Sequence, residues 1–301
     1  MHKTSILKKE LPLHIMLLPA IILVLIFSYG PIVGIIMAFQ DYIPGSGWYI
    51  FGSKFIGLEN FKYVLTYNPG QVLWNTVYIA GLKAVTGLFF PITFALMLNE
   101  VRKAPLKRGI QTLIYLPNFL SWVILSGMLI DILSPQNGIV SKLLSYIGVE
   151  CPFFLADNHW FPWILVGSNL WKEAGFATIV YLAAITGIDL SLYEAATVDG
   201  AGHIRRLRHI TLPGMTPVIV LMGVLSLGNI LNAGFEQVFN LYSPVVYQSG
   251  DILDTFVYRI GIHDAQYGVS AAVGLFKSVV SFGFISIAYY LAYKFADYRL
   301  F

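Results

Sequence analysis

Long runs of apolar residues dominate the chain and recur from one end to the other. A helix needs about 20 mostly apolar residues to cross the hydrocarbon core of a bilayer. Six stretches have that length, and we expect each to be a helix because backbone groups in lipid must be hydrogen-bonded within the segment. The expected spans are residues 13–39, 72–98, 112–133, 161–187, 214–234 and 270–295.

The first apolar run follows a basic segment, MHKTSILKKE, which resembles the start of a secretory signal peptide. The run over residues 13–39 is longer than the apolar region of a signal peptide, which has about 7–15 residues. It also lacks a clear small-residue cleavage site. We therefore interpret it as a retained first span.

Lysine and arginine are divided unevenly between the polar segments. Most of them lie in residues 3–9, 102–108, 205–208 and 294–299. Because cytoplasmic loops are enriched in these two residues, the pattern predicts that these segments and both termini are cytoplasmic. The opposite loops carry aromatic residues such as Trp48, which are typical of the membrane–water boundary.

Composition agrees with a location in lipid. Hydrophobic residues make up 57% and charged residues 12% of the 301 residues, whereas soluble domains have roughly 45–50% and about 25%. The net charge of +3 is small and there is no long basic run, so we expect no nucleic-acid partner. With Cys151 as the single cysteine, a disulfide framework and a thiolate metal site are excluded. We expect one all-α integral membrane domain over residues 1–301.

The segment between the fourth and fifth expected spans carries the most specific local pattern. Residues 189–217 read DLSLYEAATVDGAGHIRRLRHITLPGMTP. Ser191 followed by Glu194 is a capping-box pattern, which predicts the start of a short helix. Gly200 lies about two turns later, where a left-handed C-cap is expected.

A second short helix is expected after this glycine, with Ile204, Leu207 and Ile210 on one face and the arginines mostly turned away. Pro213 then suits the first turn of the fifth span. An apolar stripe with a basic rim is typical of a helix that docks into a groove on a partner protein. An amphipathic loop lying on lipid headgroups would show the same pattern, and both readings remain open at this point.

The same segment, EAATVDGAGHIRRLRHITLPGMTP, resembles the EAA signature of permease subunits of binding-protein-dependent ABC importers. The matching positions are Glu194, Ala195, Ala196, Asp199, Gly200, Ala201, Ile210, Leu212, Pro213 and Pro217. In that family the segment forms a coupling helix that sits in a cleft of the ATPase subunit. The resemblance implies that residues 189–213 are a cytoplasmic coupling loop, whose ATPase contacts also include Ile204 and Leu207. Leu207 replaces a common aromatic residue, which affects the fit more than the role.

Further stretches are similar to the carbohydrate branch of this family, which includes alginate- and maltose-type importers. They are residues 55–65, 114–124, 171–196 and 228–261. The resemblance implies a type I importer permease with six transmembrane helices in the bacterial cytoplasmic membrane. It also implies a second homologous permease, two ATPase subunits, an extracellular solute-binding protein and a carbohydrate substrate. ATP and Mg²⁺ would be bound by the ATPase subunits, and this chain would bind no cofactor.

Charged residues also occur within the expected spans: Lys83, Lys172, Glu173 and Lys277. A charge at mid-bilayer costs about 2.5–3.5 kcal/mol on insertion scales, so such residues usually face a cavity or another helix. Lys172 and Glu173 are adjacent and point about 100° apart, so they are not expected to pair with each other. We expect one of them to meet Lys83 or Lys277, as a structural ion pair or at the translocation path.

Polar and aromatic residues cluster in and after the fifth span. The spacing of Asn229, Asn232 and Glu236 predicts that they lie near one helical face. Carboxamides and carboxylates bind sugar hydroxyl groups, and the rings of Phe235 and Phe239 offer stacking faces. Hydrogen bonding between membrane helices would account for the same amides. The translocation path and helix packing both remain open for these residues.

Catalytic motifs are missing from the sequence. There is no Walker A motif, no G-x-S-x-G and no H-E-x-x-H, so we expect a subunit that is not an enzyme. The main alternative is a secondary transporter driven by an ion gradient, which predicts inverted repeats and paired ionisable residues at mid-membrane. The sequence shows no convincing repeat.

Overall fold

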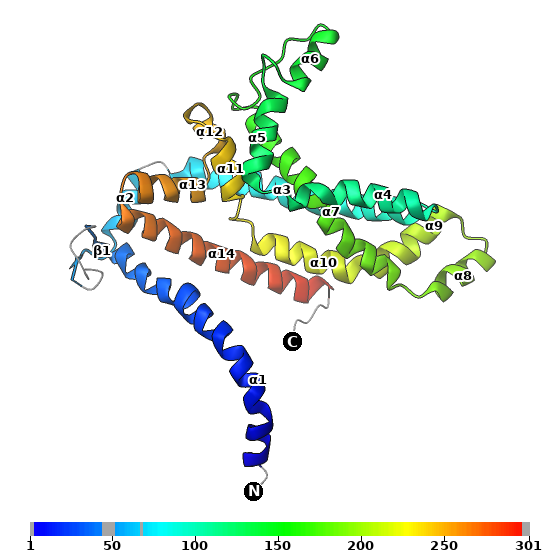
Figure 1. Ribbon diagram of the computed structural model, residues 1–301, viewed down its shortest axis with the longest axis horizontal. Coiled ribbons are helices and arrows are strands. Elements are labelled where there is room, and N and C mark those ends of the chain that lie inside the picture. Colours follow the sequence, from blue (N-terminus) through cyan, green and yellow to red (C-terminus); the bar gives the residue numbers. More distant parts are fainter. Residues whose placement is uncertain (1–2, 44–51, 67–68, 297–301) are drawn as a thin grey trace. The chain divides into compact units, whose positions relative to one another are not determined.

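The computed structural model describes residues 3–43, 52–66 and 69–296, which are almost entirely helical (Figure 1). Trp48 lies outside these residues. The chain divides into two compact units, one formed by Met1–Asn68 with Val257–Phe276 and the other by Pro69–Phe256 with Lys277–Phe301. The prediction of an all-α fold is confirmed, apart from one two-residue strand pair. The single transmembrane domain stays a prediction.

The first unit begins with helix α1 (Lys3–Val24), which continues through a π turn, η1 (Leu25–Tyr29), into a 3₁₀ segment, η2 (Gly30–Phe39). Together, Leu11–Phe39 form a 29-residue apolar run that is long enough to cross a membrane. Short π and 3₁₀ segments leave the backbone hydrogen-bonded along its own axis, which is what lipid requires.

A small polar motif closes this first helical run. Strand β1 (Gln40–Asp41) pairs antiparallel with β2 (Lys54–Phe55), and helix α2 (Glu59–Thr66) follows. The side-chain amide of Asn60 donates hydrogen bonds of 3.0 Å to the carbonyls of Ala38 and Gln40. These bonds satisfy carbonyls that the end of η2 leaves free.

The second unit contains most of the helices. They are α3 (Pro69–Glu100), α4 (Ala104–Tyr115), η3 (Leu116–Phe119), α5 (Trp122–Leu133), α6 (Ile139–Tyr146), α7 (Phe161–Thr186), α8 (Leu190–Val198), α9 (His203–Arg206), η4 (Leu207–Thr211), α10 (Leu212–Gly228), α11 (Phe235–Leu241), η5 (Pro244–Val246) and α12 (Tyr247–Gly250). Three further elements run partly or wholly through the first unit: α13 (Leu253–Tyr258), η6 (Arg259–His263) and α14 (Tyr267–Ala296).

The core of the second unit lies between α3 and α7, which pack along each other (Figure 1). One apolar cluster includes the buried Phe161, Leu165 and Val238. A second cluster, formed by Ala95, Tyr181, Ile185 and Met215, joins α3, α7 and α10 near the start of α10. These clusters hold α3, α7 and α10 against one another.

Within the described residues, four helical segments are long and apolar enough to cross a membrane, and up to six if each of two bent pairs counts as one span. The first bent pair, Ala104–Phe119 with Trp122–Leu133, turns by 105°. The expectation of one helix over 112–133 is therefore wrong. Ser121 starts a new helix there, since its side chain accepts a hydrogen bond from the Ile124 amide at 3.3 Å. The run of apolar residues continues across this break, so its length does not indicate that the helix ends there.

The fifth span also differs from its expected limits of 214–234. It is a 26-residue helix over His203–Gly228 with a π turn at η4. The helix ends at Gly228, and Gly234 adopts φ +92° before α11 begins. The second short helix of the coupling loop and the fifth span are therefore one continuous element.

Candidate functional site

The coupling loop begins with helix α8, which follows α7 after a bend of 64°. Its N-cap is Asp189, whose Oδ1 accepts a 2.9 Å hydrogen bond from the Ser191 amide. This bond holds the pKa of the Asp189 carboxyl below its ordinary value, because it favours the charged form. The expected capping box of Ser191 and Glu194 is wrong: the helix begins at Leu190, so Ser191 lies inside its first turn.

The other end of α8 closes at Gly200, as expected. This residue has φ +72°, its amide donates to the Thr197 carbonyl at 3.1 Å, and the Ala201 amide donates to the Ala196 carbonyl at 2.8 Å. The two bonds form a Schellman motif. An added Cβ at Gly200 would have no atom within 4 Å, so the left-handed backbone rather than space requires glycine here.

Most of the predicted coupling residues on α8 and in the turn after it are exposed. Glu194, Ala195, Asp199 and Gly200 are exposed, while Ala196 and Ala201 are half-buried. The apolar side chain of Val198 is 88% exposed. A short helix that is fixed at both ends and exposes apolar surface is suited to contact a partner or lipid.

The second part of the loop does not present one apolar face. Ile204 is 77% exposed, whereas Leu207 lines a pocket and Ile210 is half-buried. The expected apolar face is therefore not uniform: Ile204 is exposed while Leu207 and Ile210 are partly covered, and the π turn η4 alters the helical spacing from Leu207 onward. Arg206 also folds back, and its guanidinium donates to the Thr197 hydroxyl at 3.1 Å.

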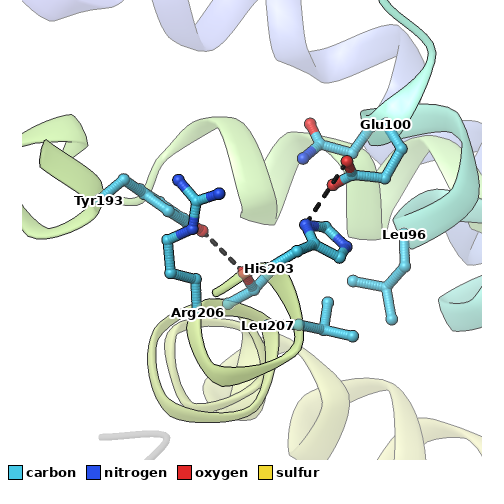
Figure 2. A pocket seen from close by; sticks show the side chains of 8 residues that line it. Leu96, Glu100, Tyr193, His203, Arg206 and Leu207 are labelled. Atoms are coloured by element: carbon cyan, nitrogen blue, oxygen red, sulfur yellow. Dashed lines mark hydrogen bonds and ion pairs between the residues drawn. The ribbon is translucent and has the colours of Figure 1, made fainter. Parts of the chain in front are cut away.

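A pocket of about 180 Å³ lies between α8, α9 and the end of α3 (Figure 2). The Tyr193 hydroxyl is 2.9 Å from Thr211 Oγ1, and His203 Nδ1 is 3.7 Å from a Glu100 carboxylate oxygen. The lining residues are Leu96, Asn99, Glu100, Tyr193, His203, Arg206, Leu207 and Thr211. The Tyr193–Thr211 bond could not be expected from the sequence, because its partners are 18 residues apart.

A larger cavity of about 530 Å³ lies between α3, α7 and α10. It brings together three of the predicted path residues: Asn229, Asn232 and Glu173. Lys83, which was expected to face a cavity or another helix, also lines it, as does Asn169, which no sequence pattern had indicated. The full lining is Ala80, Lys83, Ala84, Asn169, Glu173, Met222, Leu225, Ser226, Asn229, Asn232, Ala233 and Gly234.

The predicted helical face over residues 229–236 does not exist, because α10 ends before it and a turn separates it from α11. Phe235, Glu236 and Phe239 lie on α11 and are not among the residues that line the cavity. The two phenylalanine rings stack on each other with centroids 5.3 Å apart. Asn229 and Asn232 reach the cavity from the turn instead.

Lys172 is buried and stabilises the bend in the third span. Its Nζ donates to the carbonyls of Asn118 at 2.9 Å and Leu120 at 2.6 Å, and it lies 5.6 Å from the centre of a Trp122 ring. Glu173 accepts a 3.1 Å hydrogen bond from the side-chain amide of Asn118. Both charges therefore meet polar groups that the 105° bend exposes. Glu173 also lines the 530 Å³ cavity together with Lys83 and interacts electrostatically with it, so the expected meeting of these two charges is confirmed, whereas Lys172 meets carbonyl groups.

The other two lysines in the spans also have structural partners. Lys277 forms a 2.5 Å ion pair with Asp254. Lys83 donates to the Ala233 carbonyl and to Gln237 Oε1, both at 2.5 Å. Gln237 in turn donates to the Leu165 carbonyl and the Ser168 hydroxyl of α7. Lys83 thus links α3 to the turn after α10, and through Gln237 to α7.

Among the described residues, no three His, Cys, Asp or Glu side chains lie close enough to hold a metal ion.

Comparison with known proteins decides the family. Residues 87–297 match the family model of binding-protein-dependent transport system inner membrane components. The chain belongs to this family. The permease is thus a non-catalytic ABC-transporter subunit and a multi-pass protein of the bacterial inner membrane. The EAA resemblance is confirmed, and family membership argues against an ion-driven secondary transporter.

Relatives match the permease over nearly its full length. Protein LplB of Bacillus subtilis (strain 168) is 41% identical over 98% of this chain and 92% of its own. The polygalacturonan/rhamnogalacturonan transport system permease protein YteP of the same organism is 42% identical over 95% and 88%. A solved bacterial alginate ABC transporter, in complex with an alginate pentasaccharide-bound periplasmic protein, is 38% identical with a TM-score of 0.88 over 98% of both chains.

Proposed function

We propose that this chain is the permease subunit of an ATP-driven importer that moves an oligosaccharide across the cytoplasmic membrane. The near-full-length similarity to the alginate transporter supports this most directly. The name of YteP supports the same substrate class. The complete importer would contain a second homologous permease, two ATPase subunits and an extracellular solute-binding protein that delivers the substrate.

The energy for transport would enter through α8. Its two caps make it a rigid element, and its exposed residues offer a surface for an ATPase cleft. The proposed contacts are Glu194, Ala195, Ala196, Asp199, Gly200, Ala201, Ile204, Leu207 and Ile210. ATP and Mg²⁺ would be held by the ATPase subunits, so this chain is expected to need no cofactor of its own.

The 530 Å³ cavity is the proposed part of the translocation path in this chain. Its carboxamides, Asn169, Asn229 and Asn232, offer both donors and acceptors for sugar hydroxyl groups. Glu173 adds an acceptor. The structural partners of Lys172 and Lys277 argue against a substrate contact for these two lysines.

Co-purification tests the docking of α8. Gly200→Asp adds a charged side chain at a left-handed residue, and we expect it to abolish both association with the ATPase subunits and uptake. Gly202→Asp is the matched control, because it adds the same charge at φ −67°, where aspartate is a favourable N-cap. Association and uptake should persist in this control. An intact, active Gly200→Asp complex would refute the proposed docking.

Uptake by reconstituted complexes tests the path. The panel consists of oligogalacturonate, alginate and arabinose oligosaccharides. Asn169→Ala and Asn232→Ala should each raise the KM for the transported member by several fold, since a neutral hydrogen bond contributes about 0.5–1.5 kcal/mol. Asn240→Ala is the control, because Asn240 lies on α11 away from the cavity lining. If Asn169→Ala and Asn232→Ala both keep the wild-type KM, as the control does, the cavity is not the translocation path.

A further inference from the structure

One hydrogen bond ties the middle of α8 to the residue that precedes α10 within the fifth span. The Tyr193 hydroxyl lies 2.9 Å from Thr211 Oγ1, at the wall of the 180 Å³ pocket (Figure 2). Thr211 is only 5% exposed and Tyr193 is half-buried, so water competes weakly for this bond.

Both ends of α8 connect to the rest of the chain through non-helical residues. Residues 187–189 separate it from α7, and residues 199–202 separate it from α9. Such connectors are positions where φ and ψ can change when elements move. The backbone alone therefore does not force α8 and α10 to move together, and side-chain contacts must do so.

Two other contacts near α8 are less suited to that role. Gly214 on α10 packs closely on Ile188, since an added Cβ would lie 2.6 Å from Ile188 Cδ1. Apolar contact is non-directional, so it leaves α8 free to rotate about this point. The bond from Arg206 to Thr197 is exposed to water. The Tyr193–Thr211 bond is directional and shielded, and it fixes the rotation.

Thr211 is well placed to pass on a displacement. It immediately precedes α10, whose 17 residues extend about 26 Å to the cavity. Asn229 caps the far end of this helix and lines the 530 Å³ cavity. A shift of α8 that reaches Thr211 therefore moves a rigid helix that ends at the cavity.

The geometry points to Tyr193 and Thr211 as a positioning pair that makes α8 and α10 move as one body during transport. The inference rests on the proposed docking of α8 to an ATPase subunit. Neither residue lines the 530 Å³ cavity. The pair sets how much transport each ATP hydrolysis event produces, while docking itself depends on the exposed surface of α8.

Isosteric variants of the complete transporter, tested with the panel member that the wild type takes up best, separate coupling from folding. Thr211→Val keeps the shape and removes the hydroxyl, and Tyr193→Phe removes the other hydroxyl. We expect each variant to retain ATPase association and hydrolysis, and to move several-fold less oligosaccharide per ATP. Thr211→Ser should restore the wild-type ratio. Thr197→Val removes two exposed bonds, the one from Arg206 and the one to the Tyr193 carbonyl, but leaves both hydroxyl groups of the pair; it is the control and should keep that ratio.

The double variant decides whether the two hydroxyl groups act through one bond. Tyr193→Phe with Thr211→Val should lose no more coupling than either single variant. The inference would be overturned if the two losses of coupling multiply in the double variant. It would also be overturned if both single variants show the wild-type uptake per ATP. Loss of ATPase association in the single variants would also overturn it, by showing a role in assembly. Failure of the docking proposal is recognised separately, by an active Gly200→Asp complex.

A distance measurement tests rigid-body motion without a substrate. Spin labels at the exposed Val198 and Leu227, in a Cys151→Ser background, report the separation of α8 and α10. We expect ATP to leave this distance unchanged in the wild-type complex and to change it in Thr211→Val. A nucleotide-dependent change of equal size in both proteins would contradict the pair's role.

Discussion

Gly175 lies where α4 crosses α7, and a methyl group added there has no room. A Cβ at this residue would lie 2.1 Å from the Ile114 carbonyl oxygen and 2.8 Å from Ile114 Cγ2. Carbon and oxygen atoms in close C–H···O contact are about 3.3–3.6 Å apart. Alanine would therefore force the two helices apart by about 1 Å, or bend one of them.

The size of this effect follows from two opposing contributions. Overpacking of this kind costs about 1–3 kcal/mol, while alanine gains about 0.5–1 kcal/mol over glycine inside a helix. We therefore expect Gly175→Ala to destabilise the protein by up to about 2.5 kcal/mol. Gly167 lies on the same helix, and a Cβ there has no atom within 4 Å. Gly167→Ala should be neutral or stabilising.

Thermal unfolding of the purified transporter in detergent measures the difference. Gly175→Ala should lower the melting temperature relative to the wild type, and Gly167→Ala should leave it unchanged or raise it. The comparison isolates the contact with Ile114, since both variants make the same chemical change in one helix. Should Gly175→Ala melt at or above Gly167→Ala, the close packing of α4 on α7 would be wrong.

Three further changes test the polar contacts. Lys277→Met should lower the melting temperature by leaving Asp254 partly buried without its partner, at a cost of about 1–3 kcal/mol; exchanging the two residues should recover part of the loss. Lys172→Met should destabilise the bend before α5, because two carbonyls lose their donor at about 1–3 kcal/mol each; Lys172→Arg should be milder in the same melting assay. The depressed pKa of Asp189 means that its cap stabilises α8 above the unfolded pKa of about 3.9, and that this contribution is lost as pH falls through the folded pKa. Amide exchange at the start of α8, corrected for intrinsic rates, should therefore become faster in acid, and Asp189→Ala should remove this dependence.

Part of the candidate site could be predicted from the sequence because it depends only on residues that are neighbours in the chain. The left-handed C-cap at Gly200 follows from a residue type and its position, because glycine adopts that backbone at little cost. The prediction of a capping box is wrong for a reason that is also local. Asp189 competes with Ser191 for the role of N-cap, and aspartate two residues earlier moves the helix start.

Contacts between distant segments could not be predicted in this way. The role of Lys172 depends on two carbonyls that are free only because the third span bends by 105°. The length of the apolar run did not report that bend, although Pro117 lies beside it and the helix before it is the more polar of the two. The bond between Tyr193 and Thr211 likewise depends on where α8 lies against the base of α10.

The sequence by itself determined the membrane location, the approximate spans and the family, because these depend on composition, run length and a motif of contiguous residues. Only the tertiary structure decided where the spans break, which groups neutralise or bind the charges within them, and which amides meet at the cavity. Those features arise when helices far apart in the chain approach each other, and each helix then satisfies polar groups that another leaves free.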